Sequence, residues 1–275
     1  MRQSWLIWAT TTAAFFLTAT TIVVSGSLQE PARGNQSFGG AANHLGKLEA
    51  DYRVARTGRS LSGITSESSP YSSALSQASV DYQPPEKVML AHPSNYGERF
   101  PVDINGNVVD NQYIVVLHET VGSASSALNT FQTNHPNDND QVSYHTLIGL
   151  DGTIYYVVPP EQRAFGAGDS FFQGSFGEEA VFTNAEFPSS VNNFAYHVSL
   201  ETPPDGQNNN RSGHSGYTEA QYQSLAWLLA RTTVPNDRIT THKAVDRSGS
   251  RSDPRSFEPQ RLLNLLDRYP SRAGL

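Results

Sequence analysis

The sequence contains no cysteine. This absence excludes disulfide bonds, thiolate metal sites and cysteine nucleophiles. A bound transition metal must therefore be held by histidine and carboxylate side chains, and the chain has eight histidines. The lack of cysteine is compatible with an oxidising compartment but does not identify one.

Positive charge is also scarce. The chain has 19 Lys and Arg against 26 Asp and Glu, which gives a formal net charge of -7 at pH 7. No basic stripe or polybasic patch is present, so we expect no nucleic-acid partner. A length of 275 residues with 37% hydrophobic residues suits one sizeable core in one or two domains. We expect a monomer.

The N-terminus resembles a targeting segment. Arg2 precedes an uncharged, largely apolar run that ends in small residues near Ser25, as in a secretory signal. The run is also long enough for an uncleaved anchor, although its many threonines weaken a permanent span. We interpret residues 1–26 as a signal peptide or membrane anchor, and we predict an exported protein of the periplasm or cell envelope.

The next segment differs from both of its neighbours. Residues 27–84 are rich in Ser, Gly, Ala, Gln and Asn, and residues 60–79 have almost no apolar period. Such a stretch cannot bury enough apolar surface to offset the entropy lost on ordering. We predict a flexible low-complexity linker over 27–84 and a folded domain over 85–272.

The folded part contains strand patterns. Residues 113–117 form a continuous β-branched run that is typical of a buried central strand. Residues 144–148 and 153–158 flank an Asp-Gly turn and predict a hairpin. Residues 195–200 alternate in polarity, which places His197, Ser199 and Glu201 on one face of a further strand.

Helix patterns follow these strands. Residues 218–231 are amphipathic and begin with a capping box formed by Thr218 and Gln221. Residues 258–268 predict a second helix, and residues 125–131 predict a shorter one. Because strands alternate with helices, we predict an α/β fold with a central mixed β-sheet flanked by helices.

Three polar residues stand where strands end. His118 follows the run 113–117, His242 follows a short predicted strand at 238–241, and Asp253 lies eleven residues later. Two imidazoles and a carboxylate leave a fourth tetrahedral position for water, as a catalytic zinc site requires. Zinc lowers the pKa of such a water to about 7. From spacing alone, a histidine at a strand end is more often an ordinary polar residue than a metal ligand.

Short segments along the chain match one family in order. They are residues 114–120 (IVVLHET), 142–148 (VSYHTLI), 151–154 (DGTI), 164–168 (AFGAG), 198–201 (VSLE), 218–229 and 241–253. Together they resemble the N-acetylmuramoyl-L-alanine amidase type 2 family, which includes AmpD, amidase-type phage lysozymes and peptidoglycan recognition proteins. The resemblance implies their fold and hydrolysis of the amide between N-acetylmuramoyl and L-alanine in peptidoglycan.

The resemblance also implies roles for residues. His118, His242 and Asp253 match the family's Zn²⁺ ligands, and Glu201 matches an acidic residue that acts as general base. The competing interpretation of Glu201 is a solvent-facing residue at a strand end.

Two further positions are implied to be catalytic. Arg251 stands where the family usually has a lysine that stabilises an oxyanion, and Tyr144 matches a tyrosine lining the site. Arg251 can instead be a surface arginine, and Tyr144 can instead pack in the core.

Departures from the family leave alternatives open. Gly166 stands where many relatives have a histidine, and the segment 169–193 is long and rich in Phe. We expect its phenylalanines to fasten it to the core, with a substrate wall as the alternative. The roles of His197 and His214 stay open.

Two other functions compete with this hypothesis. The protein could be a non-catalytic peptidoglycan-binding module, or a hydrolase of another amide.

Overall fold

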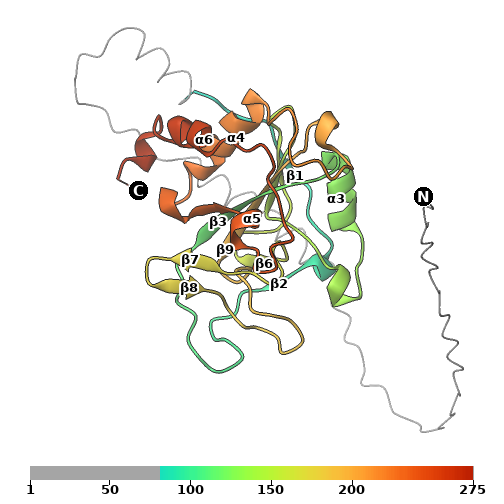
Figure 1. The fold of residues 1–275 in the computed structure, drawn as a ribbon, viewed down its shortest axis with the longest axis vertical. Coiled ribbons are helices and arrows are strands. Elements are labelled where there is room, and N and C mark those ends of the chain that lie inside the picture. Colours follow the sequence, from blue (N-terminus) through green and yellow to red (C-terminus); the bar gives the residue numbers. More distant parts are fainter. Residues whose placement is uncertain (1–80, 275) are drawn as a thin grey trace, which may run out of the picture. The chain divides into compact units, whose positions relative to one another are not determined.

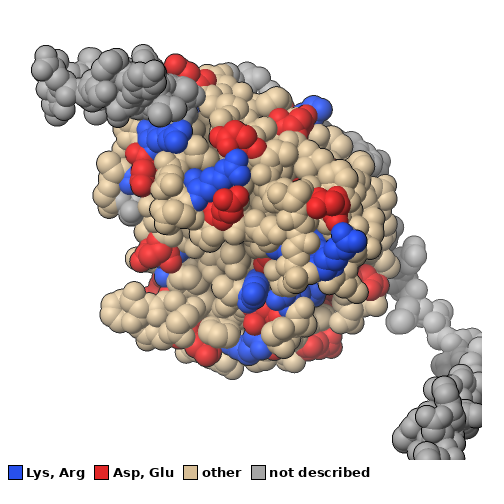
Figure 2. All heavy atoms as spheres, turned by 45° about the horizontal axis from the view of Figure 1, so that its top comes forward, with Lys and Arg blue, Asp and Glu red and all other residues tan. Residues whose placement is uncertain are grey.

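A computed structural model describes residues 81–274 (Figure 1). The predicted leader, residues 1–26, and the predicted linker up to residue 80 lie outside the described residues. Within residues 81–274, no helix is long and apolar enough to cross a membrane. In the view of Figure 2, Lys and Arg lie among Asp and Glu and do not gather in one patch.

A six-stranded mixed sheet forms the centre of the fold. Its order is β1-β5-β4-β9-β3-β10, and only the β4–β5 pair is antiparallel. The predicted α/β fold with a central mixed sheet and flanking helices is thereby confirmed. The strands are β1 (Glu86–Val88), β3 (Ile114–Glu119), β4 (Thr146–Ile148), β5 (Ile154–Tyr156), β9 (Ala195–Leu200) and β10 (Ile239–Thr241).

Helices and small sheets surround this central sheet. Two pairs of strands are antiparallel: β2 (Tyr96–Glu98) with β6 (Gln162–Ala164), and β7 (Phe172–Gly174) with β8 (Gly177–Glu179). The α-helices are α3 (Ala124–Gln132), α4 (Glu219–Leu229), α5 (His242–Val245) and α6 (Pro259–Leu266). Short 3-10 helices are η1 (Pro93–Asn95), η2 (Asp138–Asp140), η3 (Pro204–Gly206), η4 (Asn236–Arg238) and η5 (Pro270–Arg272).

The central strand β3 is covered on both faces, which explains its unbroken apolar sequence. Val115 and Leu117 belong to the apolar cluster that contains α4 and α6, and these two helices lie side by side in Figure 1. Ile114 and Val116 belong to a different cluster on the opposite face. Because side chains alternate along a strand, His118 lies on this second face, away from α4 and α6.

Helix α4 begins as its sequence predicts. The hydroxyl of Thr218 accepts a hydrogen bond from the backbone N–H of Gln221, and the Gln221 side chain accepts one from the N–H of Thr218. This capping box satisfies amide groups that have no partner within the helix. The apolar stripe that faces the sheet is fully buried, with Tyr222, Leu225 and Leu229 each 0% exposed.

The Phe-rich segment is fastened to the core at only some positions. Phe172 is buried against Ile114 and Val116, as expected of a residue that holds the insertion in place. Phe176 lies in the turn between β7 and β8 and is fully exposed. The stapling interpretation therefore holds for Phe172 but not for Phe176.

The packing of α6 predicts a large difference between two positions of one helix. Leu266 is 0% exposed, whereas Asn264 is exposed. Replacing Leu266 by Ala leaves a cavity, so we expect the free energy of unfolding to fall by about 2–5 kcal/mol. Asn264→Ala should change it by about 0.5 kcal/mol or less. Urea unfolding of the two variants measures both values, and equal losses would contradict the assigned orientation of α6.

Candidate metal centre

Parallel strand pairing brings the two predicted histidine ligands together. Strands β3 and β10 are neighbours, with Thr241 opposite Leu117. The next residues, His118 within β3 and His242 at the start of α5, therefore lie side by side at one edge of the sheet. Their rings lie 4.6 Å apart between centroids, and α5 starts at His242 with Thr241 as its N-cap.

The third predicted ligand reaches this edge from a loop. Asp253 lies with both carboxylate oxygens 3.1 Å from His242 Nδ1, and its Oδ2 lies 3.5 Å from His118 Nδ1. A backbone hydrogen bond of 2.9 Å from Lys243 N–H to the Asp253 carbonyl holds the loop against α5. One donor atom from each of the three residues lies within 4.8 Å of the other two.

The protonation states of this group suit a cation. Burial lowers the pKa of His118 to about 4, so its ring is neutral at pH 7 and offers a lone pair. Burial acts to raise the pKa of Asp253, but its interactions with His118 and His242 outweigh this and hold the pKa well below its usual range. Neutral imidazole and ionised carboxylate are the forms that bind metal ions.

A buried nitrogen without a hydrogen-bond partner also supports a metal site. His118 is 0% exposed, and its Nδ1 makes no hydrogen bond of good geometry although it faces Asp253. A buried polar nitrogen without a partner is costly, and a cation between the three side chains would satisfy it. Two imidazole nitrogens and a carboxylate form a common ligand set of catalytic zinc. The residues present therefore fit a metal ion.

A cavity of about 550 Å³ opens beside this group. Tyr144, Arg251 and His242 all contribute to its wall, so the structure brings both Tyr144 and Arg251, the two further positions implied to be catalytic, to the cavity. The ring of Tyr144 stacks on His118 with 4.3 Å between centroids. Other lining residues carry charge or aromatic rings: Asp138, Asp140, Arg163, Phe165, Asp169 and Phe187.

Glu201 is placed differently from the other predicted residues. Strand β9 ends at Leu200, and the Glu201 carboxylate accepts hydrogen bonds of 2.8 Å from Ala124 N–H and 2.9 Å from Leu150 N–H. Ala124 is the first residue of α3, so Glu201 stabilises a helix N-terminus. It is absent from the cavity wall and from the His–His–Asp group. The residue opposite His118 in the sheet is Ser199.

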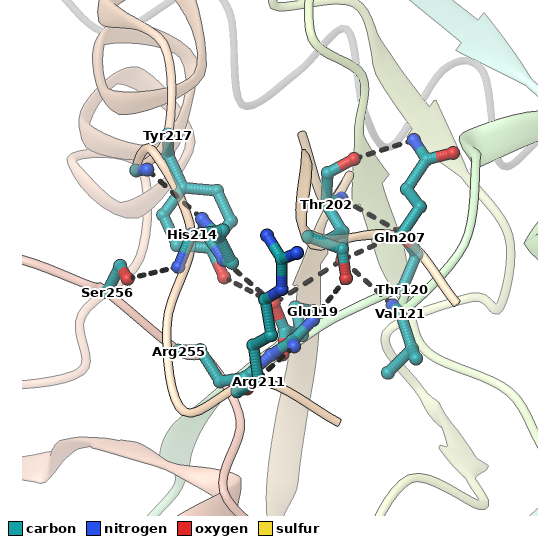
Figure 3. A network of polar contacts seen from close by, with 12 residues as sticks. Glu119, Thr120, Val121, Thr202, Gln207, Arg211, His214, Tyr217, Arg255 and Ser256 are labelled. Atoms are coloured by element: carbon teal, nitrogen blue, oxygen red, sulfur yellow. Dashed lines mark hydrogen bonds and ion pairs between the residues drawn. The ribbon is translucent and has the colours of Figure 1, made fainter. Parts of the chain in front are cut away.

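A buried polar network next to the candidate metal centre was not anticipated from the sequence (Figure 3). Glu119, which follows His118, forms an ion pair with Arg255, and their side chains are 1% and 4% exposed. The second oxygen of Glu119 accepts hydrogen bonds of 3.1 Å from Tyr217 and from His214. His214, which stayed unassigned in a polar loop, thus has a side chain that is 0% exposed.

The same arginine organises the loop that crosses the network. Arg255 donates hydrogen bonds to the carbonyl groups of Gly206, Asn209 and Arg211. It stands two residues after Asp253, whereas Glu119 stands one residue after His118. The ion pair therefore ties the loop carrying one proposed ligand to the strand carrying another. The sequence offers one sign of this ion pair: each of its two charged residues stands within two positions of a proposed ligand.

The chain is similar to known proteins. A family model described as N-acetylmuramoyl-L-alanine amidase matches residues 110–256. A solved structure of a selenomethionine derivative of AmpD is 24% identical, covers 67% of this chain and 96% of its own, and has a TM-score of 0.47. The amidase AmiD from E. coli, solved with anhydro-N-acetylmuramic acid-L-Ala-D-gamma-Glu-L-Lys, is 20% identical, covers 62% and 65% respectively, and has a TM-score of 0.42. No curated protein sequence matches the chain.

The buried ion pair predicts a large loss on removal of one partner. Arg255→Met leaves Glu119 charged and buried without its main partner, so we expect the free energy of unfolding to fall by about 3–5 kcal/mol. Arg261→Met breaks a pair with Glu219 whose side chains are 33% and 57% exposed, and should cost about 1 kcal/mol or less. Denaturant titration of both variants compares them. Similar losses of unfolding free energy in the two variants would show that burial does not increase the contribution of the Glu119–Arg255 pair to stability.

Proposed function

The chain belongs to the N-acetylmuramoyl-L-alanine amidase family and is a peptidoglycan amidase, and from this premise we propose a zinc-dependent mechanism. In this mechanism the bond cut is the amide between the lactyl group of N-acetylmuramoyl and L-alanine. His118, His242 and Asp253 would hold Zn²⁺.

One observation supports zinc most strongly. Three residues that are each at most 9% exposed bring one donor atom each together, and His118 Nδ1, which faces this group, has no hydrogen-bond partner. Bound zinc supplies a Lewis acid and lowers the pKa of a water molecule to about 7. The adjoining cavity gives a substrate carbonyl access to this position.

Two side chains of the cavity wall suit the charge that develops during hydrolysis. Water oxygen adds to the carbonyl carbon, the C–N bond breaks, and the leaving nitrogen of L-alanine takes up a proton. Burial of its hydroxyl group raises the pKa of Tyr144, so Tyr144 keeps its proton and can donate a hydrogen bond to the oxyanion. Arg251 adds a positive charge at the same wall.

Export stays part of the proposal. Residues 1–26 carry the pattern of a secretory signal or anchor, and peptidoglycan lies outside the cytoplasmic membrane. We therefore propose that the enzyme acts in the cell envelope.

The ligand assignment predicts joint loss of metal and activity. His118→Ala removes a donor atom from the centre, so we expect purified protein to retain no zinc and to release no stem peptide from peptidoglycan. His92→Ala is a matched control, because within residues 81–274 the His92 ring hydrogen-bonds only with nearby Ser94. Zinc content by mass spectrometry and peptide release are measured together. Retained stoichiometric zinc in His118→Ala would rule out this ligand set.

The family resemblance and the structure predict different hydrolysis rates for the Glu201→Gln variant. A lost general base lowers the rate by about 10²–10⁴-fold. In the structure both carboxylate oxygens already accept backbone hydrogen bonds. We therefore expect the rate to stay within about tenfold of the unmodified enzyme and the free energy of unfolding to fall by about 1–3 kcal/mol, because one amide loses its acceptor. A rate loss of 10² or more with unchanged stability would assign the general base to Glu201.

A further inference from the structure

His197 lies against the proposed ligand His118 from the neighbouring strand. Both rings are 0% exposed, and His118 Nε2 lies 2.9 Å from His197 Nδ1. The two residues are diagonal neighbours on one face of the β3–β9 pair, since His197 is opposite Val116 and Ser199 is opposite His118. Both side chains therefore project from the same face of the sheet.

The hydrogen bond decides which nitrogen of His118 faces the centre. His118 Nδ1 points toward Asp253 and has no hydrogen bond, whereas Nε2 points toward His197. A neutral imidazole that binds a metal through Nδ1 carries its proton on Nε2 and needs an acceptor for it. His197 Nδ1, at 2.9 Å, stands where that acceptor is needed. Ligating histidines generally donate their other N–H to a partner that holds the ring in place.

His197 is itself held firmly. Its backbone N–H donates to His145 Nδ1 at 2.9 Å, and its carbonyl accepts from the His145 N–H at 3.0 Å. The other nitrogen of His145, Nε2, donates to the carbonyl of Gln162 at 3.1 Å. The rings of His145 and His197 are nearly parallel, with an interplanar angle of 9°. The acceptor atom is thus positioned by buried contacts that do not involve the metal centre.

The chain also leaves a space for this ring. A Cβ atom added at Gly166 would lie 2.6 Å from Cγ and Nδ1 of His197, which is closer than any tolerated contact. Gly168, two residues further along, has nothing within 4 Å of the same added atom. Any larger residue at position 166 would therefore collide with His197 Nδ1, the atom that lies 2.9 Å from His118 Nε2.

We propose that His197 is a positioning residue, which orients His118 and fixes its tautomer so that Nδ1 faces the metal, and that Gly166 is small to admit it. This inference rests on the proposed metal centre. It assigns a function to a histidine that carries no ligand or catalytic role in the mechanism above.

Cobalt binding to the purified protein tests the proposal without relying on activity. Co²⁺ affinity is measured by chelator competition, and ligand geometry by the visible absorption of the bound ion. His197→Leu removes the acceptor, so we expect affinity to fall about 10–100-fold with an altered spectrum. His197→Asn places a carbonyl oxygen near the position of Nδ1 and should recover most of the affinity and the original spectrum.

Glycine variants test the same contact without changing His197. Gly166→Ala should displace the ring and weaken Co²⁺ binding about tenfold or more, whereas Gly168→Ala should leave affinity and spectrum unchanged. This pair keeps the test decisive if His197→Leu does not fold. Unchanged affinity and spectrum in folded His197→Leu, or in Gly166→Ala, would overturn the positioning role while leaving the metal centre intact. Failure of the unmodified protein to bind Co²⁺ would instead overturn the proposed function.

Discussion

The geometry of the candidate metal centre depends on the buried ion pair between Glu119 and Arg255. One partner adjoins His118 on β3, and the other stands two residues after Asp253 in the loop. Taking two charges out of water is costly unless their remaining hydrogen bonds are satisfied, and here Tyr217 and three backbone carbonyls satisfy them. The loop is therefore held at a defined distance from the strand before any metal is bound.

The sheet divides structural and chemical tasks between its two faces. Val115 and Leu117 pack against the helices α4 and α6, while His118 and His197 lie on the opposite face. There Tyr144, which lines the cavity, stacks on His118. Because β9, β3 and β10 run parallel, their carboxyl ends meet at one edge, as is usual for ligand sites in such sheets. This arrangement places buried histidines beside an open cavity without exposing the core.

Local patterns predicted the elements well, and long-range contacts escaped prediction. Strand β9 and the capped start of α4 follow from alternation and capping chemistry. The approach of His118 and His242 follows from their positions at the carboxyl ends of two neighbouring parallel strands. The alternation of side chains along the strand places Glu201 on the same face as His197 and Ser199. Strand β9, however, ends at Leu200, so this alternation does not determine where the Glu201 side chain points, and its carboxylate contacts the start of α3. The partner of Glu119 is 136 residues away in sequence, and no local pattern carries that information.

The central claim is that a metal held by His118, His242 and Asp253 performs amide cleavage in peptidoglycan. Its most direct test is digestion of purified sacculi by the full chain after removal of metal with a chelator and again after zinc is restored. The account predicts new amino termini on L-alanine only in the zinc-restored sample. Equal release by metal-free enzyme, or new reducing sugar ends in place of amino termini, would contradict it.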